Sequence, residues 1–131
     1  MQEKMDIRVM RSQLGRVRGL GSAHAGVHHW QAERVTAIAL VPLTVWFVVS
    51  VLVLLGADQP TVVHWAGRPW NTVLLLVLIG MTFHHMHLGL QVVYEDYMHE
   101  KWSQNAAILA TRGVSLLLAL FAAIAVLKMA F

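Results

Sequence analysis

The chain has 131 residues, enough for one domain, and 57% of them are apolar while only 13% are charged. Soluble domains average about 45–50% apolar and about 25% charged residues, so this composition indicates a membrane protein. The sequence contains no cysteine, which excludes disulfides, thiolate metal sites, iron–sulfur ligation and cysteine nucleophiles within this chain.

The N-terminal segment, residues 1–33, is polar and basic. Residues 1–34 hold six basic and three acidic side chains, so they account for the whole net charge of +3. Next to a membrane span, such a segment is expected to face the cytoplasm and the anionic headgroups rather than nucleic acid. A signal peptide needs an apolar core of about 7–15 residues, which this segment lacks. We expect a tail at the membrane surface, with a short helix around residues 27–34.

The first apolar segment, residues 35–57, is about 23 residues long, which gives roughly 34 Å of helix and spans a bilayer. Pro42 lies inside this segment and predicts a kink, which is tolerated where a neighbouring helix shields the freed carbonyl. Residues 58–71 contain two prolines, a glycine and two tryptophans. This composition predicts a loop in the headgroup zone.

Two more apolar segments follow, at about residues 72–94 and 106–130, with Tyr97 and Trp102 marking an interface between them. Arg112 lies two turns inside the third segment, so it is expected to snorkel or to meet a polar partner. The three segments predict an all-α integral membrane protein, with an anchor domain over residues 34–131.

The distribution of Lys and Arg predicts the orientation of the chain. With three spans, the N-terminus and residues 95–105 share one side of the membrane, and that side holds eight of the ten basic residues. The positive-inside rule therefore places the N-terminus in the cytoplasm and the C-terminus outside. We expect a multi-pass protein of a bacterial inner membrane, with the mitochondrial inner membrane as the alternative.

The second span carries three clustered histidines, His84, His85 and His87. Ionisable residues within a span are costly, and a functional role is their default interpretation. A bundle hydrogen bond is the alternative, and it explains at least one of the three. No two of them stand at i and i+4, the spacing with which paired histidines hold zinc on one helix face. A zinc site built by this helix alone is therefore weakly supported.

His85 lies on a stripe with Gly89, Val92 and Asp96, because eleven residues bring Asp96 to within about 20° of His85 around a helix. A glycine one turn from a histidine leaves a flat recess in which a planar ring fits. Together the two residues suit axial ligation of a haem in a helix bundle. Close helix packing at Gly89 is an equally good interpretation of the glycine alone.

Asp96 and Tyr97 lie about 16 Å along the helix from His85, at the expected cytoplasmic interface. A tyrosine hydroxyl there can donate a hydrogen bond to a carbonyl, and a carboxylate can orient it or relay protons. This pair suits a quinone headgroup. The alternative is an aromatic-belt residue beside a solvated loop charge.

The sequence from His85 to Tyr97 resembles H-x-x-x-G-x(6)-D-Y, the pattern at the end of the second helix in the small hydrophobic membrane anchors of succinate dehydrogenase, respiratory complex II. Gly26-Val27-His28 and the stretch from Arg34 to Ile38 are also similar to the start of that family's first helix. The resemblance covers roughly residues 26–131.

The resemblance implies roles for five residues. His85 would be an axial ligand of the haem b iron, with the second ligand supplied by the larger cytochrome b anchor subunit. Tyr97 would hydrogen-bond the ubiquinone carbonyl, and Asp96 would support it. Arg34 and His28 would approach the haem propionates or the quinone pocket.

The neighbouring histidines are not assigned by this pattern. His29 stands where some family members have an acid, and His84 and His87 are not required, although one of them could reach a propionate. The chain has no flavin motif and no succinate-binding domain, so it would be a non-catalytic subunit that anchors the flavoprotein and iron–sulfur subunits. The family passes electrons from succinate to quinone in the tricarboxylic acid cycle and respiratory chain.

Two alternatives stay open on the sequence. One is the anchor of another quinone-linked oxidoreductase, such as a fumarate reductase cytochrome b subunit. The other belongs to a different class, a structural or assembly membrane protein whose histidines bind copper or zinc without haem.

Overall fold

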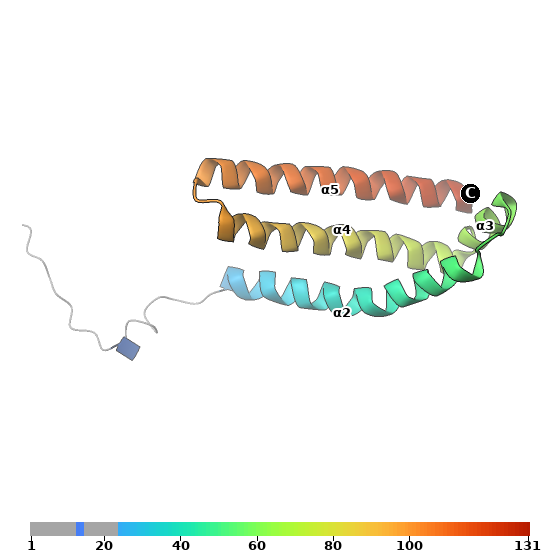
Figure 1. The fold of residues 1–131 in the computed structure, drawn as a ribbon, viewed down its shortest axis with the longest axis horizontal. Coiled ribbons are helices and arrows are strands. Elements are labelled where there is room, and N and C mark those ends of the chain that lie inside the picture. Colours follow the sequence, from blue (N-terminus) through green and yellow to red (C-terminus); the bar gives the residue numbers. More distant parts are fainter. Residues whose placement is uncertain (1–12, 15–23) are drawn as a thin grey trace, which may run out of the picture.

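A computed structural model of the chain describes residues 13–14 and 24–131. Residues 24–131 form an all-helical bundle in which the long helices lie side by side, with α4 between α2 and α5 (Figure 1). Three of the helices are long and apolar enough to cross a membrane, which confirms the expected fold class. The helices are α2 (His24–Val53), α3 (Gln59–Ala66), α4 (Pro69–Tyr97) and α5 (Lys101–Ala130).

Each long helix begins before the apolar segment that predicted it, whereas α2 ends at Val53, before the predicted end at residue 57. The expected short helix at residues 27–34 is the first part of α2, which continues without a break through Pro42 to Val53. Figure 1 shows α2 curving towards α3 in its second half. Hydropathy marks only the part of a helix that matches the hydrocarbon layer, whereas the hydrogen-bonded backbone continues through flanking polar residues.

The prediction of a loop over residues 58–71 is wrong, because α3 and the start of α4 lie there. Both prolines occupy the first turn of a helix, where the missing N–H has no intrahelical partner to lose. The Asp58 carboxylate caps α3 by accepting the Thr61 backbone N–H at 3.2 Å. Hydrogen bonds from Thr61 hold the pKa of Asp58 below its usual value.

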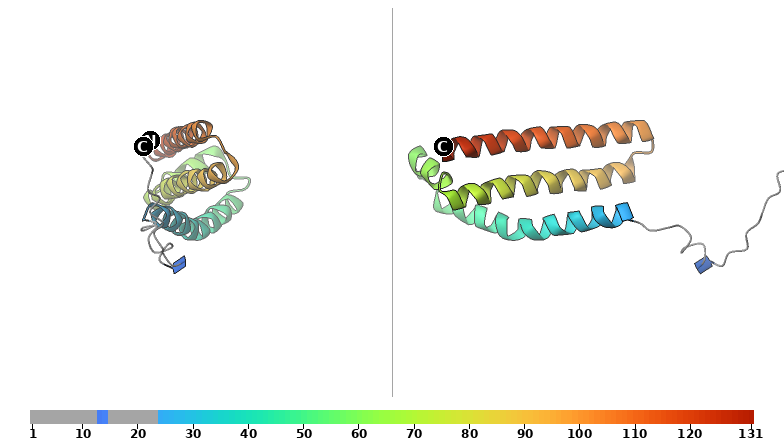
Figure 2. Two further views of the ribbon diagram at one scale, coloured as in Figure 1. Left: turned by 90° about the vertical axis from the view of Figure 1, so that its left-hand side faces the viewer. Right: turned by 180° about the vertical axis from the view of Figure 1, so that it is seen from behind.

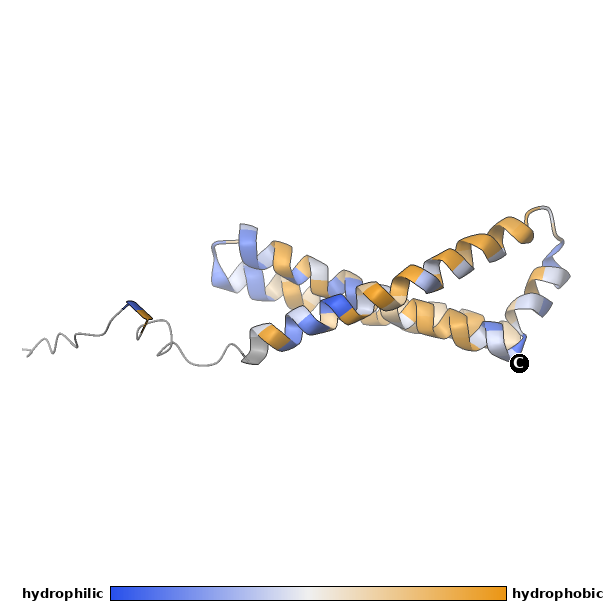
Figure 3. Ribbon diagram, turned by 90° about the horizontal axis from the view of Figure 1, so that it is seen from below, coloured by the Kyte–Doolittle hydropathy of each residue, from blue (hydrophilic) through white to orange (hydrophobic). Residues whose placement is uncertain are grey.

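The two ends of the bundle differ in chemistry. The start of α2 and the turn between α4 and α5 lie at one end, and α3 and the C-terminus lie at the other (Figure 2). This arrangement confirms that the N-terminal side of the first span and residues 95–105 share one side. Figure 3 shows apolar residues along the middle of the long helices and hydrophilic residues gathered where α2 begins and α4 ends.

Few side chains of the bundle are buried. Its buried apolar cluster comprises Ala66, Leu75 and Val126, and Trp46 stacks on Trp65 beside it with ring centroids 5.8 Å apart. Many large apolar side chains of the long helices point outward instead. Such an exterior suits lipid tails and partner helices, because lipid is as apolar as the side chains that contact it.

Gly67 follows α3 and lies against the end of α5. A Cβ atom at this position would stand 2.6 Å from the backbone oxygen of Met129. Because the clash is with backbone, no side-chain rotation could relieve it. Only glycine therefore lets α3 approach the end of α5 this closely.

Substituting Gly67→Ala should push α3 away from α5 and destabilise the bundle by about 1–3 kcal/mol. A lowered thermal unfolding midpoint of the detergent-solubilised protein would show this effect. Gly113→Ala is the matched control, since a Cβ there meets nothing within 4 Å. Equal midpoints for the two variants would contradict the close contact.

Candidate functional site

His85 connects the second and first spans. Its half-buried ring lies on α4, and its Nδ1 atom is 2.9 Å from Oγ1 of Thr36 on α2. Thr36 is only 5% exposed. The bond joins residues 49 positions apart in the sequence, so it fixes the ring against the crossing of two transmembrane helices.

Gly89 leaves the surface beside His85 open. A Cβ atom built at this glycine would meet no atom of the described chain within 4 Å outside its own helix backbone. The alternative interpretation of this glycine was close helix packing. No other helix of the described chain packs closely against Gly89. An imidazole with one nitrogen held by Thr36 and a flat glycine surface one turn away fit a planar macrocycle ligated through the other nitrogen.

His84 and His87 form a separate cluster with Arg112. The two rings stack with centroids 5.3 Å apart, and His87 Nδ1 lies 3.1 Å from the backbone oxygen of His84. Arg112 Nε donates to His87 Nε2 at 3.3 Å. The expectation that Arg112 meets a polar partner is confirmed. His87 forms a hydrogen bond between two helices of the bundle, as one of the two interpretations of the histidines expected.

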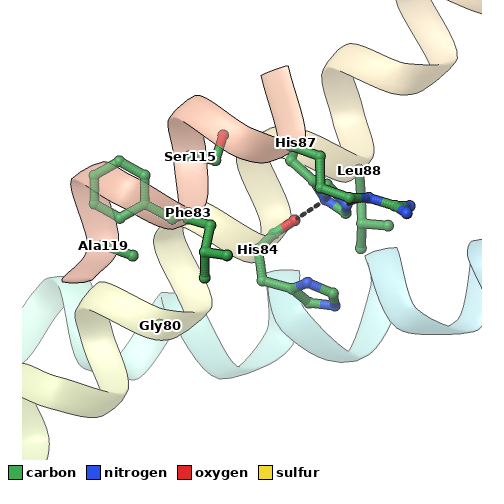
Figure 4. A pocket seen from close by; sticks show the side chains of 9 residues that line it. Gly80, Phe83, His84, His87, Leu88, Ser115 and Ala119 are labelled. Carbon is green, nitrogen blue, oxygen red and sulfur yellow. Dashed lines mark hydrogen bonds between the residues drawn. The ribbon is translucent and has the colours of Figure 1, made fainter. Parts of the chain in front are cut away.

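The cluster lines a cavity of about 520 Å³ between α4 and α5 (Figure 4). The other lining residues are largely apolar: Gly80, Phe83, Leu88, Ser115, Leu116 and Ala119. Within residues 24–131, no group of three or more His, Asp or Glu side chains is placed to hold a metal ion.

Asp96 and Tyr97 occupy the last turn of α4, at the polar end of the bundle, and both are exposed. Tyr97 is 78% exposed, so its hydroxyl is free of the bundle interior. The structure thus places the expected pair at the end of α4, at the same end of the bundle as the start of α2.

A residue that the sequence did not single out, Gln104, secures this helix end. Its buried side chain on α5 donates from Nε2 to the backbone oxygens of Tyr94 at 3.1 Å and Met98 at 3.4 Å. The Tyr94 hydroxyl also lies 2.9 Å from Thr111 Oγ1. The two bonds from Gln104 hold the end of α4 against α5 and so position Tyr97.

The residues expected near the propionates lie on the first half of α2. Arg34 and His28 are both exposed, and the Arg34 guanidinium carbon stands 5.7 Å from the centroid of the Trp30 ring. No hydrogen bond of the described chain joins either residue to His85; the contact from α2 is Thr36 instead. His29 has a buried Nε2 atom with no partner in the described chain.

Three apolar spans with outward-facing large side chains and polar groups at one end define a helical integral membrane protein. Residues 8–127 match the family described as the succinate dehydrogenase/fumarate reductase transmembrane subunit, so the chain belongs to that family. The resemblance drawn from the sequence is confirmed. No solved structure matches the chain.

Individual relatives support the same family. The chain is 34% identical over 107 residues to the "succinate dehydrogenase hydrophobic membrane anchor subunit" of Rickettsia bellii, covering 82% of this chain and 86% of that protein. It is 36% identical over 93 residues to the protein of the same name from Paracoccus denitrificans, covering 70% of each. The "succinate dehydrogenase membrane anchor subunit" of Reclinomonas americana is 26% identical over 95 residues, covering 70% of this chain and 79% of that protein.

These findings establish the coarse function. The chain is a non-catalytic membrane-anchor subunit of an enzyme complex of the succinate dehydrogenase type, and it associates with the other subunits of that complex. Its three spans and its bacterial relatives make it a multi-pass protein of a bacterial inner membrane.

Proposed function

We propose that the chain and a larger cytochrome b anchor subunit hold haem b between them, and that this chain completes part of a ubiquinone reduction site. The proposal rests on the geometry of His85. Its Nδ1 atom contacts Thr36, and the surface at Gly89 beside it is open. Haem b, when bound, supplies a one-electron carrier next to the quinone site.

Each residue of this chain has a binding task in the proposal. His85 would hold the iron through Nε2, and the open surface at Gly89 would leave room for the ring. Arg34 and His28 are exposed on α2 and offer positive or hydrogen-bonding groups to carboxylates such as the propionates. The larger anchor subunit would supply the other protein ligand of the iron.

Tyr97 donates its hydroxyl hydrogen to a ubiquinone carbonyl, and Asp96 orients that hydroxyl or relays a proton to the reduced quinone. Their exposure at the end of α4 leaves both side chains available to a headgroup entering from the membrane. The partner subunits then close the site around the headgroup, since this chain covers neither residue.

The polar end of the bundle faces the cytoplasm in this proposal. Eight of the ten basic residues belong to that side of the chain, as the positive-inside rule requires. The flavoprotein and iron–sulfur subunits dock at the same end, so their electrons reach a quinone at Tyr97. We also propose that the basic tail, residues 1–23, contributes to this docking. Apart from residues 13–14, that tail lies outside the described residues.

Deleting the chain tests the anchoring function directly. Succinate oxidation measured with a soluble dye should move from the membrane to the soluble fraction, because the catalytic subunits lose their anchor. Succinate-dependent quinone reduction in the membranes should fall to background. Dye-linked activity that stays on the membrane, with normal quinone reduction, would overturn the proposal.

A further inference from the structure

We propose that Thr36 is a positioning residue that holds the His85 ring with its proton on Nδ1 and thereby leaves Nε2 as the iron-binding nitrogen. This inference rests on the proposed role of His85 as a haem ligand. Thr36 lies on a different helix and outside the motif that points to His85, and its contact is visible only in the folded chain.

The hydrogen bonds of Thr36 decide which group donates. Its Oγ1 atom lies 2.8 Å from the backbone oxygen of Ala32 and 3.0 Å from that of Glu33, as well as 2.9 Å from His85 Nδ1. A carbonyl oxygen only accepts, so the two carbonyls compete with His85 for the single hydroxyl hydrogen of Thr36 and favour its donation to the backbone of α2. The hydroxyl oxygen then accepts from His85, which requires a proton on Nδ1.

A neutral imidazole carries one proton, so a proton on Nδ1 leaves the lone pair on Nε2. The same hydrogen bond orients the ring, because Thr36 belongs to α2 while His85 belongs to α4. Thr36 is buried, so water does not compete strongly for the bond. The bond to Thr36 therefore selects the tautomer of His85 and the direction in which Nε2 points.

The same reasoning separates His85 from its neighbour His87. Both ring nitrogens of His87 have partners, Nδ1 with the backbone oxygen of His84 and Nε2 with Arg112. In the described chain, the hydrogen bonds of His85 involve Nδ1 alone. Of the two rings, only His85 presents a nitrogen that is free for a metal.

The test compares Thr36→Val with Thr36→Ser in the whole complex. Valine keeps the shape but removes the acceptor, whereas serine keeps the hydroxyl. Without the acceptor the imidazole becomes a weaker electron donor, which favours the reduced iron, so the haem midpoint potential should rise. Loss of an outer hydrogen bond commonly changes metal binding by about tenfold or more. A tenfold loss of affinity for the oxidised iron relative to the reduced iron raises the potential by about 59 mV for one electron.

Two control variants accompany the measurement. Thr44→Val changes an exposed threonine of the same helix and should leave the potential unchanged. His85→Ala in parallel tests the ligand itself. The flavin content of each preparation corrects for assembly, and low-spin haem g-values report the ligand geometry independently of turnover.

The expected result is a raised potential and shifted g-values in Thr36→Val, with values near wild type in Thr36→Ser. A wild-type potential in Thr36→Val, together with haem loss in His85→Ala, would overturn the role of Thr36 and leave the ligand assignment intact. Haem unaffected by His85→Ala would instead overturn the proposed function. Equal shifts in the valine and serine variants would show that the hydroxyl is not responsible.

Discussion

The substitution His85→Ala is expected to remove haem b from the complex. Alanine offers no lone pair to the iron, and the methyl group leaves an opening beside Gly89 in place of the imidazole. The haem-to-flavin ratio of the purified complex, measured as the pyridine haemochrome, should fall at least tenfold, since losing even an outer hydrogen bond to a ligand costs about tenfold or more.

The neighbouring histidine supplies the control for this experiment. His87→Ala removes the acceptor of Arg112 but not the proposed ligand, so haem content should stay close to the wild-type ratio. Full haem content in His85→Ala, or haem loss confined to His87→Ala, would contradict the ligand assignment.

The substitution Tyr97→Phe is expected to lower succinate-dependent ubiquinone reduction by about tenfold to a hundredfold. It removes one hydrogen bond to an oxygen that gains negative charge during reduction, and such bonds contribute about 1.5–3 kcal/mol. Succinate oxidation with a soluble dye should not change, because that reaction does not use the quinone site. Parallel assays on the same membranes separate the two effects.

Tyr94→Phe is the matched control, since the Tyr94 hydroxyl contacts Thr111 inside the bundle rather than the exposed end of α4. This variant should lose some thermal stability and keep quinone reduction. Normal quinone reduction in Tyr97→Phe would remove the assigned role of that hydroxyl. A large defect in Tyr94→Phe alone would instead assign the effect to the position of the helix end.

The fold was largely predictable because apolar segments of bilayer length have one stable solution, a transmembrane helix. The error at residues 58–71 came from treating both prolines as breakers. In the structure each proline lies in the first turn of a helix, and Asp58 caps α3. The polar turns at the helix ends were missed because hydropathy reports contact with hydrocarbon rather than backbone hydrogen bonding.

Part of the candidate site follows from one helix and was therefore predictable. The spacing of His85, Gly89 and Asp96 is a property of α4 alone. The contact with Thr36 depends on how α2 crosses α4, which no pattern within either segment specifies. The same holds for Gln104, since its role depends on where α5 begins relative to the end of α4.

The most direct measurement is an optical spectrum of the complex purified through a tag on this chain, recorded before and after succinate is added. We expect the flavoprotein and iron–sulfur subunits to copurify and succinate to produce the bands of a reduced b-type haem. Purified chain that carries copper or zinc, without haem and without a succinate-oxidising partner, would contradict it.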